Sequence, residues 1–372
     1  MTSTARRELY AGVMSGTSLD GVDAVLVEFP RDVGAPRLLC GTHVDFPSTL
    51  RRELLALQAP ESDEIARAAR AANVLADLYA HALRSVCLVA GVPAHEVIAA
   101  GVHGQTVRHR PHEGWTTQIN NPARVAEGAY MTVVADFRTR DIAAGGQGAP
   151  LVPAFHAAMF TLPERHRVIV NIGGIANITD LPTRGPVRGF DTGPGNVLLD
   201  HWSALHRGAP FDEGGAWAAS GKVDASLLQS LLAEPYFALA PPKSTGRDLF
   251  DARWLEARVG GGSARAPADV QATLVELTAA TIADAITTHC AEAVDVLVCG
   301  GGARNDTLQR ALAARLAPRR VAPTSEQGVP VDQVEAMAFA WLAREALAGR
   351  PGNLPAVTGA RGPRVLGAIY PR

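Results

Sequence analysis

Apolar residues recur at two different spacings along this chain, and the two spacings predict strands that alternate with helices. Short apolar runs such as Leu9–Val13 and Ala24–Phe29 have the length of buried strands. Glu61–Ala90 instead has one apolar stripe at three- and four-residue steps, which predicts one long helix or a pair of helices. The stripe consists of Ile65, Ala69, Ala72, Leu75, Tyr79, Ala82 and Val86. Strands that alternate with helices of this length indicate an α/β fold.

The same reasoning predicts the remaining elements. Further strands are expected at Arg37–Phe46, Val97–Ala100, Met131–Ala135, Val294–Val298 and Val365–Tyr370. Three further helices are expected over Val197–His206, Asp269–Cys290 and Asp332–Ala348. A short helix is expected to begin at Asn121-Pro122, and another helix, after the glycine turn at 300–302, is expected to end at Leu316. Residues 207–267 have no clear period and are predicted to be the least regular part.

Two glycine-rich turns, each between two strands, divide the pattern into similar halves. The first lies in Gly12–Asp23 and the second in Val168–Thr179. Glycine lets the backbone come close to a ligand, and successive backbone amides form a concavity that suits an anion such as phosphate. An ordinary hairpin turn would explain either one alone. Two of them, one in each half, indicate a duplicated α/β unit with a ligand between the copies.

Length and composition narrow the class of protein. A chain of 372 residues exceeds one compact core, so two domains are expected. A net charge of −2 favours neither a nucleic acid nor an anionic membrane as partner. The cysteines form no CxxC motif and no zinc-ligand spacing, so free thiols in a reducing compartment are expected at Cys40, Cys87, Cys290 and Cys299. Because neither a signal peptide nor a run of ~20 apolar residues is found, we expect a cytoplasmic protein.

Polar residues follow several predicted strands, where open α/β sheets place their ligands. His103 and Gln105 follow the strand Val97–Ala100, although a hydrogen-bonded turn would also explain the histidine. Asp136–Asp141 and the glycine stretch Ala143–Pro150 are expected to cross between lobes and to touch ligand. A solvated loop with local ion pairs is the alternative for this stretch.

Two later positions have similar alternatives. Asp191 lies at a strand end before a helix, where it could accept a proton from a nucleophile or cap the helix. Glu335 lies in the first turn of a helix, where a carboxylate also suits the helix dipole. Three glycines in Cys299–Asn305 would let a planar group lie against the backbone, but they do not form the G-x-G-x-x-G motif of a dinucleotide-binding fold.

These features together are those that phosphoryl transfer needs. The Walker A, G-x-S-x-G and H-E-x-x-H motifs are absent from the sequence. Phosphoryl transfer requires positioned phosphates, a metal ion and a base that orients the nucleophile. The glycine turns and Asp191 could supply the first and last, and Asp20 or Asp23 could hold a cation beside the phosphates.

A series of motifs, in order over nearly the whole chain, resembles those of the anhydro-N-acetylmuramic acid kinase family. The motifs are Met14–Asp23, Gly101–Thr106, Asp136–Arg138, Gly145–Leu151, Asn171–Asn177, Phe190–Asn196, Lys243–Arg247, Gly300–Asn305 and Glu335–Ala340. Asp248 stands where the family pattern has glutamate, which is a conservative departure.

The resemblance implies the fold of the actin, hexokinase and heat-shock chaperone superfamily, with two ribonuclease H-like lobes and an active-site cleft between them. Lobe I would comprise residues 1–140 and 333–372, and lobe II residues 141–332. The implied activity uses ATP and Mg²⁺ to open 1,6-anhydro-N-acetylmuramic acid with water and to phosphorylate O6. The product would be N-acetylmuramic acid 6-phosphate, in peptidoglycan recycling. A homodimer is also implied as possible.

The resemblance also implies roles for single residues. Asp191 would be the base for the attacking water, and Glu335 a second catalytic residue. ATP is expected to contact Gly12, Val13, Met14, Ser15, Gly16, Thr17, Ser18, Leu19, Asn171, Gly173, Gly174, Gly300, Gly301, Gly302 and Arg304. The sugar is expected near His103, Gln105, Arg138, Arg140 and Gly148, with the choice between the two arginines open. The alternatives are another phosphotransferase of the superfamily and a non-catalytic sugar sensor.

Overall fold

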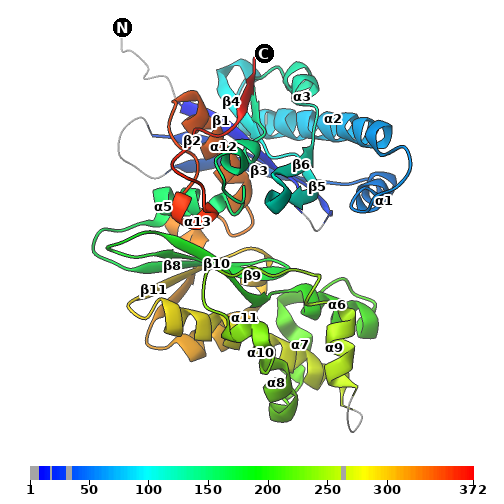
Figure 1. The fold of residues 1–372 in the computed structure, drawn as a ribbon, viewed down its shortest axis with the longest axis vertical. Helices are drawn as coiled ribbons and strands as arrows, with labels where there is room; N and C mark the ends of the chain where they lie inside the picture. The colour runs from blue at the N-terminus through cyan, green and yellow to red at the C-terminus, as the bar shows by residue number, and fades with distance from the viewer. Residues whose placement is uncertain (1–7, 17–18, 31–35, 261–264) are drawn as a thin grey trace. The chain divides into compact units, whose positions relative to one another are not determined.

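The chain forms two compact units in a computed structural model that describes residues 8–16, 19–30, 36–260 and 265–372. The first unit comprises Met1–Met159 and Gln333–Arg372, and the second comprises Phe160–Asp332. Each unit has its own mixed β-sheet and its own hydrophobic core. Each is therefore described by itself (Figure 1).

The first unit contains a six-stranded sheet in the order β13-β7-β4-β1-β2-β3. Its strands are β1 (Glu8–Met14), β2 (Gly21–Phe29), β3 (Arg37–Asp45), β4 (Val97–Val102), β7 (Val133–Ala135) and β13 (Ala368–Tyr370). β1, β2 and β3 form an antiparallel meander, whereas β4 runs parallel to β1 and β7 runs parallel to β4. A separate hairpin, β5 (Gln105–Arg110) with β6 (Trp115–Ile119), follows β4.

Two long helices cover this sheet: α2 (Glu64–Ala90) packs against β2 and β3, and α12 (Val334–Leu347) against β1 and β4 (Figure 1). Tyr79 of α2 shares a core with Val13 of β1. Because strand side chains alternate between faces, Gly12 faces α12 instead. The other helices that begin in this unit are α1 (Ser48–Ala56), α3 (Pro122–Ala129), α4 (Thr139–Ala143), α5 (Val152–Phe160) and α13 (Pro355–Thr358).

The second unit contains a five-stranded sheet in the order β10-β9-β8-β11-β12. Its strands are β8 (Arg167–Ile172), β9 (Ile175–Leu181), β10 (Arg188–Pro194), β11 (Asp295–Cys299) and β12 (Arg320–Pro323). β8, β9 and β10 form an antiparallel meander, and β11 and β12 continue the sheet in parallel from β8. Its helices are α6 (Val197–Arg207), α7 (Ala216–Ser220), α8 (Ala225–Leu232), α9 (Ala252–Val259), α10 (Pro267–His289) and α11 (Asp306–Leu316).

The two sheets share one strand order. In each unit the first three strands form an antiparallel meander, and two parallel strands extend the sheet from the first strand on its other side. This arrangement confirms the predicted α/β fold with two ribonuclease H-like units. Each meander begins with a glycine turn between its first two strands, as the sequence predicts.

The close approach of α12 to the first sheet depends on two glycines. A Cβ on Gly12 would lie 1.9 Å from the Ala336 carbonyl oxygen, and one on Gly101 would lie 1.9 Å from the Phe339 carbonyl oxygen. Neither backbone oxygen can move without displacing the helix. These glycines bring α12, which carries Glu335, directly against β1 and β4.

We therefore expect Gly101→Ala to destabilise the first unit by about 3 kcal/mol, because overpacking of a rigid backbone contact costs this much. Gly362→Ala is the matched control, since its Cβ would meet only the Nη1 atom of Arg364, at 3.3 Å. Urea unfolding followed by circular dichroism measures both. Equal unfolding free energies for the two variants would show that the contact with Phe339 is not tight.

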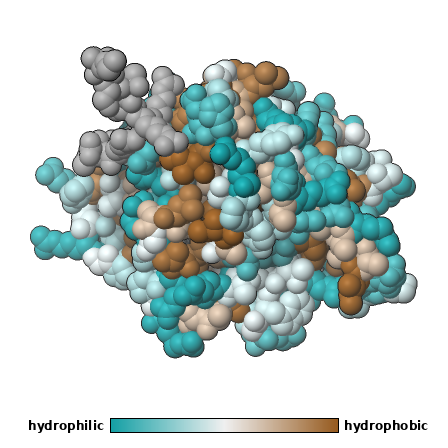
Figure 2. Space-filling model, turned by 90° about the horizontal axis from the view of Figure 1, so that it is seen from above, coloured by the Kyte–Doolittle hydropathy of each residue, from teal (hydrophilic) through white to brown (hydrophobic). Residues whose placement is uncertain are grey.

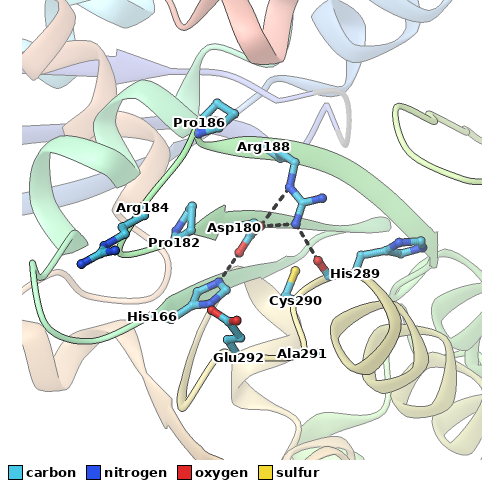
Figure 3. Close-up of a pocket in the computed structure, with 10 residues that line it drawn as sticks. All are labelled: His166, Asp180, Pro182, Arg184, Pro186, Arg188, His289, Cys290, Ala291 and Glu292. Atoms are coloured by element: carbon cyan, nitrogen blue, oxygen red, sulfur yellow. Dashed lines mark hydrogen bonds and ion pairs between the residues drawn. The ribbon is translucent and has the colours of Figure 1, made fainter.

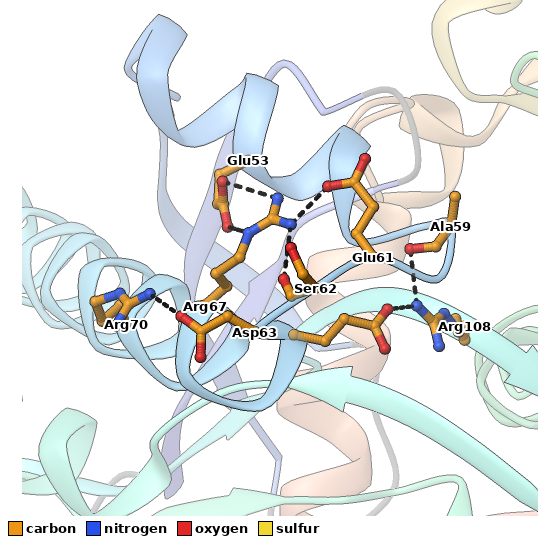
Figure 4. Close-up of polar contacts among 9 residues, drawn as sticks. Glu53, Ala59, Glu61, Ser62, Asp63, Arg67, Arg70 and Arg108 are labelled. Atoms are coloured by element: carbon orange, nitrogen blue, oxygen red, sulfur yellow. Dashed lines mark hydrogen bonds and ion pairs between the residues drawn. The ribbon is translucent and has the colours of Figure 1, made fainter.

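One long helix forms where the apolar stripe predicts it, but its first turns are not buried. Ile65 is 89% exposed, and Ala69 is also exposed, so the buried stripe begins at Ala72. Polar contacts surround this end of α2: Arg67 pairs with Glu53 and Glu61, at 2.7 and 2.6 Å (Figure 4). The apolar spacing therefore continues into the first turns of α2, although the side chains there are not buried.

Residues 207–267 are more helical than the sequence analysis predicts, because α7, α8 and α9 lie there. Two of these helices have side-chain caps. Asp224 accepts hydrogen bonds from the amides of Ser226 and Leu227, and Asp251 accepts one from the Trp254 amide. The loop predicted at Gly260–Ser263 falls largely outside the described residues.

The division between the units lies after Met159, whereas the sequence analysis places it after Arg140. Asp141 explains the difference, because its buried carboxylate accepts hydrogen bonds from Asn353 at 2.6 Å and Thr358 at 2.7 Å. These bonds fix the glycine stretch to the C-terminal part of the first unit. The C-terminal part of this unit begins at Gln333.

No described helix is long and apolar enough to cross a membrane. The face of the molecule in Figure 2 mixes apolar with polar side chains. The four cysteines are free thiols, as predicted.

Candidate active site

The first glycine turn connects β1 to β2, and part of it is fixed by buried contacts. The Ser15 hydroxyl lies 2.7 Å from the Tyr79 hydroxyl, so it faces the core of the unit. Only the backbone of Ser15 therefore remains a candidate for binding ATP. Leu19 ends the turn with a buried side chain and a φ of 56°. The predicted ATP contacts of Thr17 and Ser18 fall outside the described residues.

Gln105 supports this turn from β5. Its side-chain amide donates to the Gly16 carbonyl at 3.1 Å, and the side chain is fully buried. Within the described ranges its Oε1 atom has no hydrogen-bond partner. A buried acceptor without a partner costs free energy unless a ligand or water satisfies it. Gln105 thus holds the turn, and its Oε1 atom is left for a ligand or a water molecule.

His103 and Arg138 form one buried contact. Nε and Nη2 of Arg138 lie 3.0 and 2.8 Å from Nε2 of His103. Because both arginine atoms are donors, Nε2 must be unprotonated. Burial and the positive charge of Arg138 both hold the pKa of His103 well below its usual range. The histidine is therefore neutral and orients the arginine.

Arg138 also fixes the glycine stretch. Its Nη1 donates to the Gly148 carbonyl at 2.7 Å, and the Gly148 amide donates to Asp141 at 2.8 Å. Burial lowers the pKa of Arg138 to about 10, so the side chain stays charged at neutral pH. The neighbouring Arg140 is exposed on α4. Of the two predicted arginines, the structure brings only Arg138 to His103 and Gly148.

Glu335 completes this group from the first turn of α12. Burial raises its pKa, Arg138 lowers it, and Asp23 raises it further. Glu335 is half-buried, so a charged carboxylate there depends on the nearby guanidinium of Arg138. A raised pKa makes a carboxylate a stronger base, so Glu335 is a candidate for proton transfer.

Sequence reasoning missed the partners that hold the glycine stretch in place. The carboxylate of Asp141, the last residue of the predicted stretch Asp136–Asp141, binds Asn353 and Thr358, which are more than 200 positions away. A Cβ on Gly146 would lie 2.2 Å from Asp141 Oδ2, so the glycine is required for this packing. The repeated glycines of the stretch were the only signal available in the sequence.

The two predicted metal ligands have different surroundings. Asp23 lies 2.9 Å from Nδ1 of His43, and this contact contributes to raising the pKa of the histidine. Asp20 is exposed, and its Oδ1 accepts from the Gly21 amide at 2.9 Å. In the part of the chain that is described, no group of three or more acidic, histidine or cysteine side chains could hold a metal ion. Mg²⁺ commonly needs only one or two carboxylates beside phosphates, so Asp20 and Asp23 both stay candidates.

In the second unit Asp191 lies in the middle of β10, not at a strand end as the sequence analysis predicts, and beside a bulge in the β9–β10 register. Its Oδ2 accepts from the Thr245 amide at 3.0 Å, and its own amide donates to the Lys243 carbonyl at 3.1 Å. The hydroxyl of Tyr236 donates to its carbonyl at 2.9 Å. Burial raises the pKa of Asp191 to about 6, although the Thr245 bond opposes this. Asp191 does not cap α6, so the capping alternative is wrong.

The two glycine turns of this unit lie against each other. A Cβ on Gly300 would lie 2.5 Å from Asn171 Oδ1, and one on Gly302 would lie 2.3 Å from Ile172 Cγ2. Gly301 is more open, with Asn196 Nδ2 at 3.7 Å as its nearest neighbour. The predicted ATP contacts Asn171, Gly300 and Gly302 therefore lie side by side in this unit. Arg304, which follows them, forms an ion pair with Asp332.

A hollow of about 380 Å³ lies elsewhere in the second unit (Figure 3). Asp180 is buried at its floor between His166, at 2.5 Å, and Arg188, at 2.6 Å. No predicted site residue lines it. His166 and Arg188 lie at the ends of β8 and β10 that are opposite to their glycine turns.

Paired glycine turns on ribonuclease H-like units, with a carboxylate within β10, define a protein of the phosphotransferase class. The family model for anhydro-N-acetylmuramic acid kinase matches residues 8–372. The chain therefore belongs to the anhydro-N-acetylmuramic acid kinase family, and it is a kinase, as its motifs predict.

Curated relatives are similar in sequence to this chain over nearly their whole length. An anhydro-N-acetylmuramic acid kinase of Thiobacillus denitrificans is 54% identical over 369 residues, which cover 99% of this chain and 98% of that protein. An anhydro-N-acetylmuramic acid kinase of Bordetella petrii is 57% identical, over 98% of this chain and 96% of that protein. Among solved structures, a ROK family glucokinase from Streptomyces griseus is 16% identical with a TM-score of 0.42, over 91% of this chain and 99% of that chain.

Proposed function

We propose that this kinase opens the 1,6-anhydro bridge of anhydro-N-acetylmuramic acid with water and transfers the γ-phosphoryl group of ATP to O6. The product is N-acetylmuramic acid 6-phosphate, formed during murein recycling. The observation that carries the proposal is Asp191, a half-buried carboxylate within β10 whose pKa burial raises to about 6. A base with a pKa near the working pH is well suited to take a proton from water.

Apart from proton transfers, the reaction breaks two bonds, from the anomeric carbon to O6 and from the γ-phosphorus to the ADP oxygen, and forms two. Water loses a proton to Asp191 while its oxygen attacks the anomeric carbon, and the bond from that carbon to O6 breaks. The electron pair stays on O6, which attacks the γ-phosphorus and displaces ADP. The proton then leaves Asp191 for solvent. Because phosphoryl transfer captures O6, the leaving oxygen needs less help from a separate acid.

The contacts of the first unit support a role in binding the sugar. Arg138 presents a charge that Gly148 and His103 hold in one orientation. Glu335 lies within its electrostatic reach. Such a preorganised group suits the carboxylate and hydroxyl groups of a muramic acid. We assign Arg138 rather than Arg140 to the sugar, and Glu335 to proton transfer or hydrogen bonding there.

The backbone turns support a role in holding ATP. The Gly12–Leu19 turn and the turn of Asn171, Gly173 and Gly174 would bind phosphates, and Gly300–Arg304 would lie near the adenosine. Mg²⁺, when bound, would neutralise phosphate charge, and Asp20 and Asp23 are its candidate ligands. An enzyme that uses ATP in this way would work in the cytoplasm.

The pKa of Asp191 predicts how activity depends on pH. The base must be ionised, and a carboxyl with a pKa of about 6 is protonated below that pH. We expect kcat/KM to fall about tenfold per pH unit below pH 6 and to be level just above it. Initial rates at saturating ATP, with stability checked at each pH, measure this. A level profile down to pH 4.5 would contradict the assignment of Asp191 as the base.

An ADP-release assay tests the substrate. We expect release with anhydro-N-acetylmuramic acid and little with glucose, N-acetylglucosamine or N-acetylmuramic acid. Preference for a simple sugar would favour another phosphotransferase of the superfamily. No ADP with any anhydro sugar would favour a sugar sensor that uses ATP only to change conformation.

A further inference from the structure

The position of Arg247 is not explained by any hydrogen bond or ion pair among the described residues of the second unit. Its side chain is exposed, yet its guanidinium lies over the β8–β9 turn. A Cβ on Gly174 would lie 3.7 Å from Nη2 and 4.0 Å from Nε of this arginine. No carboxylate among the described residues lies within 4.0 Å of its nitrogen atoms. The donors of the guanidinium therefore remain available beside a predicted phosphate-binding turn.

The turn below Arg247 has a fixed orientation. The Gly173 carbonyl accepts from the Asn196 amide at 2.8 Å, and the Gly174 carbonyl accepts from the Gly195 amide at 2.9 Å. In a trans peptide the N–H points opposite to the C=O. The Gly174 amide thus points away from the 195–197 backbone, where it can donate to an anion.

Asp200 on α6 interacts electrostatically with Arg247 but forms no ion pair with it. Burial raises the pKa of Asp200 to about 6, and the charge of Arg247 opposes that rise. The two side chains interact through space without an ion pair of 4.0 Å or less. Asp200 can favour the location of the guanidinium while leaving its hydrogen-bond donors to a ligand.

The chain segment that carries Arg247 also holds the candidate base. The Lys243 carbonyl and the Thr245 amide bind the backbone and the carboxylate of Asp191. Lys243 in turn donates to the Phe237 carbonyl at 3.1 Å, which fixes the start of the segment. An anion bound by Arg247 would therefore lie close to the carboxylate that activates water.

We propose that Arg247 binds the transferred phosphoryl group above the Gly173–Gly174 turn. This inference rests on the proposed function. A guanidinium matches phosphate oxygens with paired donors and keeps its charge at every working pH. Phosphoryl transfer spreads charge over the three non-bridging oxygens, so a fixed cation there stabilises the transition state. The carboxylate of the muramic acid is the other anion that this chemistry would suit.

Two variants of Arg247 test whether it binds the transferred phosphoryl group or the sugar carboxylate: Arg247→Met and Arg247→Lys. The control is Arg253→Met, which changes another exposed arginine of this unit. Titration calorimetry compares a non-hydrolysable ATP analogue with ADP, and steady-state kinetics gives kcat and both KM values. For Arg247→Met we expect analogue affinity to fall about tenfold, ADP affinity to stay unchanged and kcat to fall about 10²-fold. Lysine should restore part of kcat, and the control should behave as wild type.

Other outcomes would overturn the assignment. If binding of anhydro-N-acetylmuramic acid weakens while binding of anhydro-N-acetylglucosamine does not, the anion is the sugar carboxylate. If affinities and kcat all stay within about twofold of wild type, Arg247 binds neither anion. The nucleotide comparison needs no turnover, so it still tests Arg247 if the wild-type chain proves inactive on every anhydro sugar.

Discussion

Asp191→Asn should lower kcat by about 10²- to 10⁴-fold and leave ATP binding nearly unchanged. The asparagine Oδ1 can still accept from the Thr245 amide, so the loop around position 191 should stay in place. What is lost is the ability to take a proton from water. Rapid-quench measurement of ADP formation gives kcat, and titration calorimetry gives the nucleotide affinity.

Asp248→Asn is the matched control for this variant. It makes the same chemical change on an exposed carboxylate of the segment that holds Asp191. We expect its kcat to stay within about twofold of wild type. Turnover of Asp191→Asn near the wild-type value would refute the assignment of the base, whatever the control does.

Arg138→Met should raise the KM for the sugar by about 10²-fold, because a charge-assisted contact contributes up to about 3 kcal/mol. The change removes the donors that fix Gly148 and the cation beside Glu335. The KM for ATP should change little, since the predicted nucleotide contacts lie on other loops. Steady-state kinetics with each substrate varied in turn measures the two values.

Arg140→Met is the matched control, and it decides the choice that the sequence left open. Arg140 is exposed, so this variant should keep both KM values within about twofold of wild type. Thermal unfolding of both variants separates binding from folding, because Arg138 also supports the buried contact with His103. A larger sugar KM for Arg140→Met than for Arg138→Met would reverse the assignment.

The positions of many strands and of the glycine turns could be predicted because each depends on a short stretch of sequence. Apolar runs gave β1, β2, β4, β8 and β11 to within a few residues. The Asn121 cap, which accepts from the Arg124 amide at 3.1 Å, begins α3 as expected. The helices of 207–267 were missed because they are short and follow one another without long stripes. The capping aspartates Asp224 and Asp251 were the available signal for two of them.

Contacts between distant residues could not be predicted from one sequence. Ser15 shares a hydrogen bond with Tyr79, 64 positions away, and this turns its hydroxyl from a candidate ligand into a core contact. Asp141 similarly depends on Asn353, 212 positions away. Local pattern showed which loops belong to the candidate site, whereas side-chain orientation within them follows from tertiary packing.

Turnover in ¹⁸O-labelled water tests the central claim that water opens the anhydro bridge as O6 is phosphorylated. Mass spectrometry of the rapidly quenched product should find one ¹⁸O, on the anomeric carbon, and none in the phosphoryl group. Unlabelled product kept in the same water measures exchange at the anomeric position without turnover. Label in the phosphoryl group, or anomeric label no greater than in that control, would contradict the account.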